Sequence, residues 1–192
     1  MKSLTIIKNE HRSLGAVLYC LKQLVSAVDG GKQPDFRVFH GLLMYIDRFL
    51  DRYHHPKENK YLFPAVLNRN PDLAATIELL GKQHREGEQM FIKVLKALSA
   101  YEYHGQPAFE EFKQAVSEYT TFEFEHAQKE ESEILPVAES TLSKEDWQLI
   151  DAAFLDHHDP MFGDKPTAEF SALHRQIVSI IPAPLGLGSA WE

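Results

Sequence analysis

Two stretches of this chain repeat one arrangement of histidine, glutamate and proline. Residues 54–64 and 126–136 both read H-x3-E-x5-P. On an α-helix a spacing of four residues is about 400°, so each histidine lies roughly 40° from its glutamate on one face. An imidazole and a carboxylate directed at one point are suited to bind a metal ion. The copies are 72 residues apart, which leaves room for two intervening helices and lets two helices present the motif to a shared centre.

Further polar residues interrupt the apolar stripes of the predicted helices. His11 falls in the first stripe, and His84 with Glu88 repeats the H-x3-E spacing in the third. Burying this many imidazoles and carboxylates without partners would cost more than the roughly 5 to 15 kcal/mol by which a domain is stable. A pair of metal ions would compensate, because carboxylates can bridge two cations while imidazoles complete the ligand shells. The candidate metal ligands are His11, His54, Glu58, His84, Glu88, His126 and Glu130.

Taken singly, these residues have simpler explanations. A lone histidine such as His11 on an apolar face is more often a satisfied core residue, and an isolated histidine and glutamate pair is usually at the surface. Glu88 has polar neighbours that are typical of a solvated face. The joint pattern, with each polar set in register with the apolar stripe of its own helix, favours the metal site. His55 is about 100° out of phase with His54, so we expect it behind the ligands or at the surface.

Other histidines and aromatic residues fit structural roles. We expect boundary or surface positions for the histidines without a partner at ligand spacing, which are His40, His104, His157, His158 and His174. We expect core positions for Phe91, Tyr119, Phe122 and Phe124.

Four long segments with helical periodicity must position the candidate ligands. They cover about residues 3–28, 35–64, 72–100 and 109–136, and Pro136 is expected to close the fourth. Pro56 lies inside the second, where its ring and missing N–H should kink or bulge the helix beside the site. Short connectors between long amphipathic helices predict an all-α fold, an up-down-up-down antiparallel four-helix bundle over residues 1–137.

Residues 138–192 follow a different pattern. The sequence from Ser143 to Asp146 resembles a capping box, with Asp in the usual Glu position, and opens a shorter predicted helix that continues to His157. Another short helix is expected after Pro166 and Thr167. We predict a helical C-terminal extension of two short helices, packed on the bundle or on a partner chain, rather than a second domain.

Composition limits the classes of function. The chain has 192 residues, 20 Lys and Arg against 28 Asp and Glu, and a formal net charge of −8, with no basic stripe. These features argue against nucleic acid or a membrane as the main partner. The single Cys20, beside leucines, indicates a packed thiol rather than a disulfide or a cysteine-built metal site. Because the sequence shows neither a signal peptide nor an apolar run near 18 residues, we expect a cytoplasmic protein.

The order of histidines and carboxylates resembles the hemerythrin-like, or HHE cation-binding, domain. The resemblance includes the HHPKE string at residues 54–58 and the LFP string at 62–64, and it covers residues 3 to about 136. It implies a non-haem centre of two iron ions with an oxo or hydroxo bridge, for which zinc or manganese could substitute. In this family, Glu58 and Glu130 would bridge the ions, His11 and His54 would serve one ion, and His84 and His126 the other.

Two departures from the oxygen-carrying members of this family affect the expected function. Glu88 stands where the oxygen carriers place a fifth histidine, and the fourth helix has H-x3-E instead of H-x4-D. A carboxylate is a harder, anionic ligand, or it leaves an open coordination position if it does not bind. Reversible oxygen carriage is therefore not the default expectation.

Three classes of function remain consistent with this pattern. The first is a metal protein that binds or senses O2, NO, peroxide, or iron and redox state. The second is a di-iron oxidase or peroxidase-type enzyme, or an iron-handling or repair protein. The third is a ferritin-like oxidase, which the E-x-x-H spacing of Glu123 and His126 and the weaker D-x-x-H spacing of Asp51 and His54 would suit. The expected partners are a small diatomic ligand or peroxide, and a homodimer or another protein through the extension.

Overall fold

The computed structural model describes residues 1–33 and 35–155, and every regular element in this part of the chain is helical. The long helices are α1 (Lys2–Asp29), α5 (Ala74–His104) and α6 (Phe109–Lys129). Shorter α-helices are α2 (Phe36–Ile46), α3 (His55–Lys57), α4 (Phe63–Arg69), α7 (Leu135–Thr141) and α8 (Lys144–Leu155). The π-helical segments are η1 (Asp47–His54), η2 (Glu58–Leu62) and η5 (Glu130–Ile134), and the 3-10 turns are η3 (Pro71–Leu73) and η4 (Gln106–Ala108). The all-α prediction is confirmed for these residues.

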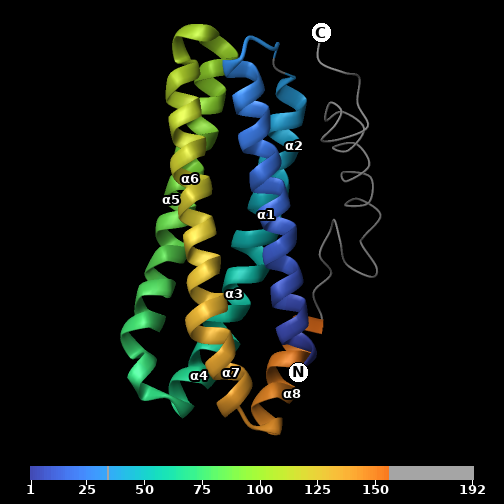
Figure 1. The fold of residues 1–192 in the computed structure, drawn as a ribbon, viewed down its shortest axis with the longest axis vertical. Helices are drawn as coiled ribbons and strands as arrows, with labels where there is room; N and C mark the ends of the chain where they lie inside the picture. Colours follow the sequence, from blue (N-terminus) through green and yellow to red (C-terminus); the bar gives the residue numbers. More distant parts are fainter. Residues whose placement is uncertain (34, 156–192) are drawn as a thin grey trace.

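The helices lie lengthwise beside one another as columns (Figure 1). The columns are α1, the run from α2 to α4, α5, and the run from α6 to α7. Along their lengths α5 contacts α6, and α1 contacts both α6 and α2. Gly31, after α1, and Gly105, after α5, have φ angles of 93° and 70°, which glycine adopts without strain. The columns formed by α1 and α5 thus end beside glycines that interrupt the apolar pattern.

The apolar core is divided into two clusters along the length of the columns. The first cluster includes Leu14 of α1, Leu50 of η1, Phe91 of α5 and Tyr119 of α6. The second cluster includes Ile7 of α1, Leu62 of η2, Leu80 of α5 and Ile134 of η5. In each column the chain passes from one cluster to the other through the stretch that carries the candidate ligands. The polar centre is therefore a layer between two apolar clusters, which exclude water from both ends.

The prolines beside the site explain the π-helical segments. In three places the residue before a proline donates its backbone N–H to the carbonyl five residues back: His55 to Leu50, Phe63 to Glu58, and Leu135 to Glu130. The proline that follows has no N–H, and its ring opposes α-helical hydrogen bonding, so the wider turn accommodates it. The bulge predicted at Pro56 is confirmed. The expectation that Pro136 closes the fourth helix is wrong, because after the π turn the helix continues as α7.

The helix α8 begins at the predicted capping box. The Ser143 backbone N–H donates to the Asp146 carboxylate at 2.9 Å, and the Asp146 N–H donates to Ser143 Oγ at 3.2 Å, which confirms the reciprocal cap. Trp147 and Phe154 of this helix are buried in the second cluster, so α8 packs against the end of the columns. The helix expected after Pro166, together with His157, His158 and His174, lies outside the described residues.

Several side chains away from the centre occupy the predicted environments. His40 is exposed and pairs with Glu102 at 2.9 Å, and His104 is also exposed. Phe91 and Tyr119 are buried in the first cluster. Two aromatic residues differ from the expectation of a core position, since Phe122 is half-buried and Phe124 is 40% exposed.

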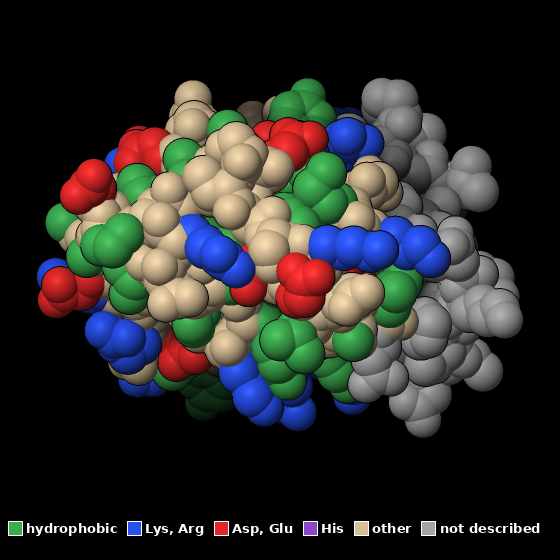
Figure 2. All heavy atoms as spheres, turned by 90° about the horizontal axis from the view of Figure 1, so that it is seen from below, with side chains coloured by type: hydrophobic (Ala, Val, Ile, Leu, Met, Phe, Trp, Pro, Cys, Tyr) green, Lys and Arg blue, Asp and Glu red, His purple; other side chains and the backbone are tan. Residues whose placement is uncertain are grey.

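The surface of the molecule carries side chains of every kind. The face seen in Figure 2 mixes basic, acidic and hydrophobic side chains. None of the described helices combines the length and the apolar character that are needed to cross a membrane.

Cys20 is partly buried against the first cluster, and burial raises the pKa of its thiol to about 11, which agrees with a packed and unreactive cysteine.

Candidate metal centre

Six of the seven predicted ligands meet in the polar layer between the apolar clusters. They are His11 of α1, His54 at the end of η1, Glu58 at the start of η2, His84 of α5, His126 of α6 and Glu130 at the start of η5. None of them is more than 7% exposed. Their ligand atoms form two groups, each within 4.8 Å: His11, His54, Glu58 and Glu130 in one, and His55, Glu58, His84 and His126 in the other. Both groups can hold a metal ion, and they share Glu58.

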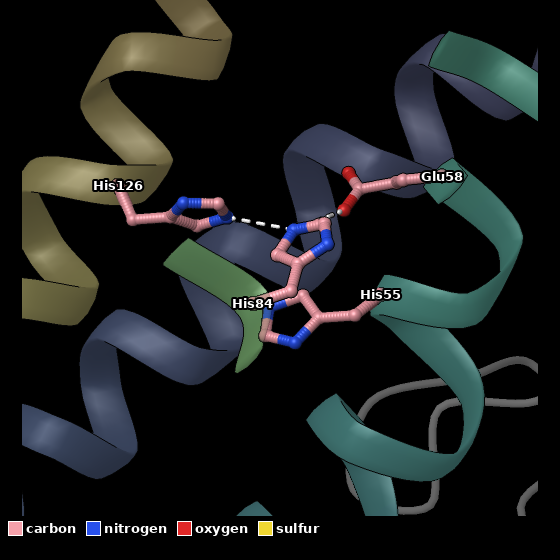
Figure 3. A group of neighbouring side chains, drawn as sticks. All are labelled: His55, Glu58, His84 and His126. Atoms are coloured by element: carbon pink, nitrogen blue, oxygen red, sulfur yellow. Dashed lines mark hydrogen bonds and ion pairs between the residues drawn. The ribbon is translucent and has the colours of Figure 1, made fainter. Parts of the chain in front are cut away.

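The four histidines His11, His54, His84 and His126, the candidate ligands, direct Nε2 toward the centre in two pairs. The Nε2 atoms of His11 and His54 are 3.1 Å apart, and those of His84 and His126 are 3.0 Å apart (Figure 3). Two imidazole nitrogens bound to one ion at about 2.0–2.1 Å and at right angles would be separated by roughly 3 Å. Each pair therefore has the spacing of two neighbouring ligands of one ion. We call the His11 and His54 pair the first half and the His84 and His126 pair the second half.

Each glutamate at the centre faces both halves. Glu58 places Oε1 at 3.3 Å from His54 Nε2 and Oε2 at 3.6 Å from His84 Nε2. Glu130 places Oε2 at 3.3 Å from His11 Nε2 and Oε1 at 3.3 Å from His126 Nε2. One oxygen of each carboxylate is thus directed to each half. This is the arrangement that a carboxylate needs to bridge two cations.

The carboxylate oxygens at the centre provide a test of whether a metal fits. All four oxygens of Glu58 and Glu130 are buried and have no hydrogen-bond partner. Their polar neighbours are the imidazole Nε2 atoms at 3.3 to 3.6 Å, which are not in hydrogen-bond geometry, and cations between these groups would satisfy the buried oxygens directly. Four imidazole nitrogens and two carboxylates also form a donor set suited to iron, manganese or zinc. The residues of this chain therefore fit a pair of metal ions.

The charge of the carboxylates perturbs the ionisable groups around them. Burial by itself would lower the pKa of His11, but the neighbouring carboxylates of Glu130 and Glu131 outweigh it and raise this pKa to about 9. Burial by itself would raise the pKa of Glu130, but the imidazoles of His126 and His11 hold it well below its usual range. The centre favours positive charge, and a metal ion that binds must displace protons from the imidazoles.

A closed ring of hydrogen bonds surrounds the ligands. The Nδ1 atom of each of the four histidines contacts a side-chain oxygen from another column. His54 contacts Glu10 of α1 at 2.8 Å, and His84 contacts Asn59 of η2 at 3.1 Å. His126 contacts Gln83 of α5 at 3.1 Å, and His11 contacts Glu131 of η5 at 3.1 Å. Each column thus supports a histidine of the next, and the last supports the first. Such partners fix the orientation of the ring and leave Nε2 free to bind metal.

The four outer residues were not predicted as part of the site. Glu10 adjoins His11 and so lies about 100° round the helix from it, yet it is only 2% exposed and reaches His54. A sequence signal does exist, since each outer residue directly adjoins a ligand of its own column. The pairs are Glu10 with His11, Asn59 with Glu58, Gln83 with His84, and Glu131 with Glu130.

His55 and Glu88 occupy positions that differ from the expectations. His55 is 5% exposed, and its ring stacks on that of His84 with centroids 3.9 Å apart, so the surface alternative is wrong (Figure 3). Nearly parallel rings, at an interplanar angle of 16°, direct their in-plane lone pairs side by side and not toward one ion. Burial, and then the charge of His84, lower the pKa of His55 well below its ordinary value.

Glu88 is exposed and belongs to neither ligand group.

The exposure of Glu88 follows from the orientation of α5. The buried residues of this helix near the site are Leu80, His84, Gly87 and Phe91. The middle of the buried face therefore lies between His84 and Gly87 around the helix axis. Glu88 lies about 100° further round the helix than Gly87. A buried carboxylate, Glu123 of α6, lies against Gly87 instead, with its Oε1 2.8 Å from where a Cβ of residue 87 would be.

A surface pocket reaches the first half of the centre. It lies between α1 and α6, has a volume of about 510 Å³, and is lined by residues that include His11, Gly15, Phe124, Gln128 and Glu131. Glu131, the outer partner of His11, has a side chain that is 43% exposed. The first half is therefore the part of the centre that is nearest to solvent along this face.

The described residues form a helical fold with a buried histidine and glutamate centre that suits metal ions. The sequence profile of the hemerythrin HHE cation binding domain matches residues 2–138, and the chain therefore belongs to this family. The chain is also 23% identical over 158 residues to the uncharacterized proteins Mb2018 of Mycobacterium bovis and Rv1995 of Mycobacterium tuberculosis. These matches cover 82% of this chain and 62% of each relative, so the chain spans less than two thirds of their length.

Proposed function

We propose that this chain is a non-haem di-iron protein that binds or senses a small molecule, namely O2, NO or peroxide, or reports iron and redox state. Its ligand set would be His11 and His54 on one ion, His84 and His126 on the other, and Glu58 and Glu130 as bridges, within an up-down-up-down four-helix bundle. The observation that carries the proposal is the placement of one oxygen of each glutamate toward each half, with all four oxygens buried and without hydrogen-bond partners.

The residues around the centre have distinct tasks in this proposal. A bound iron pair would supply an open coordination position and electrons for a small ligand. The Nε2 atoms would hold the ions, and the outer ring keeps the imidazoles oriented. The two apolar clusters exclude bulk water. The pocket between α1 and α6 offers a small ligand a route to the first half. We expect no nucleic acid or membrane partner.

A second candidate function is a di-iron oxidase or peroxidase-type enzyme, or an iron-handling protein. The observation that favours it is the number of buried carboxylates beside the centre, since Glu10 and Glu123 are each 2% exposed in addition to the two bridging glutamates. Anionic surroundings stabilise the higher charge of a ferric ion and so favour oxidation chemistry over reversible binding. Glu123 and His126 also have the Glu-x-x-His spacing of ferritin-like oxidases.

Metal analysis tests the proposal. The full chain, expressed aerobically in iron-rich medium, should contain about two irons, and His54→Ala or Glu130→Ala should lose most of them. Zinc alone, or no metal, in the purified protein would contradict the di-iron centre.

A second experiment separates binding from catalysis. The iron-loaded protein is reduced without oxygen and then exposed to O2 or peroxide while its visible spectrum and the consumption of oxidant are followed. A spectral change that reverses when O2 is removed supports binding or sensing. Continuous consumption of O2 or peroxide with added reductant supports the enzyme.

A further inference from the structure

The two halves of the centre have different outer partners. In the first half, the Nδ1 atoms of His11 and His54 contact carboxylate oxygens of Glu131 and Glu10, at 3.1 and 2.8 Å. In the second half, the Nδ1 atoms of His84 and His126 contact amide oxygens of Asn59 and Gln83, both at 3.1 Å. The closed ring is therefore anionic on one side and neutral on the other.

This difference changes how strongly each half attracts a cation. A hydrogen bond to a carboxylate is charge-assisted and makes the imidazole a more basic ligand than a hydrogen bond to a neutral amide does. The two outer carboxylates also add negative charge close to the first half, whereas the bridging glutamates are shared by both halves. Glu123 adds a buried carboxylate on the side of His126, but the acceptors bonded to Nδ1 of the second half remain neutral.

We propose that the two metal positions are unequal: the first half binds a divalent cation more tightly than the second, and Glu10 and Glu131 are the positioning residues that make it so. This inference rests on the proposed two-metal centre and adds an order of loading to it. The first half fills first, and the amide-backed second half holds the ion that exchanges more readily.

Metal titration of the metal-free full chain tests the inference. Zn2+ is followed by calorimetry and Co2+ by its visible absorption, so that neither readout depends on iron chemistry or activity. The wild type should bind two ions in two steps whose affinities differ by about tenfold or more, which is the size of effect that outer partners have on metal affinity. Glu10→Gln keeps the size of the side chain and an oxygen acceptor, and it should weaken the tighter step by about tenfold while the weaker step stays within about twofold.

A reciprocal variant separates a charge effect from structural damage. Asn59→Asp introduces a carboxylate at the acceptor of His84 without a change of size, and it should tighten the weaker step by about tenfold. A gain of affinity does not arise from a damaged fold. If Glu10→Gln does not fold, Glu131→Gln replaces it, because the Glu131 side chain is 43% exposed and tolerates substitution.

The outcomes distinguish this inference from the proposed function. Two equal steps in the wild type, or equal weakening of both steps by Glu10→Gln, would overturn the inference and leave the two-metal centre intact. Failure of the wild type to bind either ion would overturn the centre itself and the inference with it. Two separated steps in the wild type, with the tighter step weakened by Glu10→Gln and the weaker step tightened by Asn59→Asp, support both the inference and the two-metal centre.

Discussion

Gly87 of α5 lies so close to Glu123 of α6 that a Cβ atom at position 87 would be 2.8 Å from Oε1 of the glutamate. Both residues are buried, and Glu123 is three residues before the candidate ligand His126. Real Cβ atoms do not approach an oxygen this closely, so a side chain at position 87 would force Glu123 to move. The absence of a side chain on Gly87 therefore makes room for a buried carboxylate beside the second half.

Gly87→Ala is expected to destabilise the protein despite the higher helix propensity of alanine. Overpacking a buried position costs roughly 1–3 kcal/mol, against about 1 kcal/mol gained by replacing glycine in a helix. Urea unfolding should show a net loss of about 1 kcal/mol. Gly81→Ala on the same helix is the matched control, because its Cβ would meet Asn59 Oδ1 at an ordinary 3.7 Å, and it should stabilise. Equal stabilisation by both substitutions would show that Glu123 moves aside freely.

The contact between α8 and α1 should make stability fall in acid. Asp151 accepts hydrogen bonds from the Ser3 backbone N–H at 2.8 Å and from Ser3 Oγ at 2.6 Å. Burial opposes ionisation, but these bonds outweigh it and lower the pKa of Asp151 from 3.8 to about 2. Because the folded pKa lies below the unfolded value, this stabilisation is present above about pH 4 and is lost as the pH falls toward 2.

Asp151→Asn is expected to lower the free energy of unfolding at pH 7 by about 1 kcal/mol, with allowance for solvent screening. It should also flatten the decline of Tm between pH 4 and pH 2, which thermal scans at several pH values measure. An unchanged acid slope in the variant would mean that other carboxylates dominate the acid response.

Removal of metal should lower the thermal stability of the protein. A cation at 100 times its Kd stabilises the folded state by about 2.7 kcal/mol, which corresponds to roughly 5–10 °C in Tm for a chain of this size. Calorimetric scans with and without a chelator measure this difference, and it should disappear in Glu130→Ala. The same Tm for loaded and metal-free wild type would contradict coupling between the centre and the fold.

The positions of the long helices were predictable because apolar periodicity determines which face of a helix is buried. The first predicted segment, 3–28, agrees with α1 at Lys2–Asp29. The inward position of His55 was not predictable from α-helical phase, because the chain beside it is π-helical and its residues have a different angular spacing. Sequence periodicity assumes one helix type, and Pro56 changes that type at the site.

The outer ring illustrates a second limit of sequence analysis. Glu10 adjoins His11 in the sequence, but its hydrogen bond is to His54 in another column. Adjacency along the chain identifies Glu10 as a neighbour of the site, and only the packing of the columns determines which histidine it supports. The same limit applies to Glu123, because its spacing to His126 identified it as a candidate for a ferritin-like site, and only the packing of α5 on α6 shows that it lies against Gly87.

Glu88 is the predicted ligand that the structure places on the exposed face of α5, and its removal distinguishes a ligand set of six from one of seven. Glu88→Ala should leave the metal content and both binding affinities unchanged within error. Glu58→Ala, at a fully buried position, should reduce affinity by more than the roughly 10–100-fold that loss of an outer partner causes. Metal analysis and Zn2+ titration of both variants make the comparison. A loss of metal in Glu88→Ala as large as that in Glu58→Ala would contradict the set of six and mean that metal binding brings Glu88 inward from the exposed face where it lies.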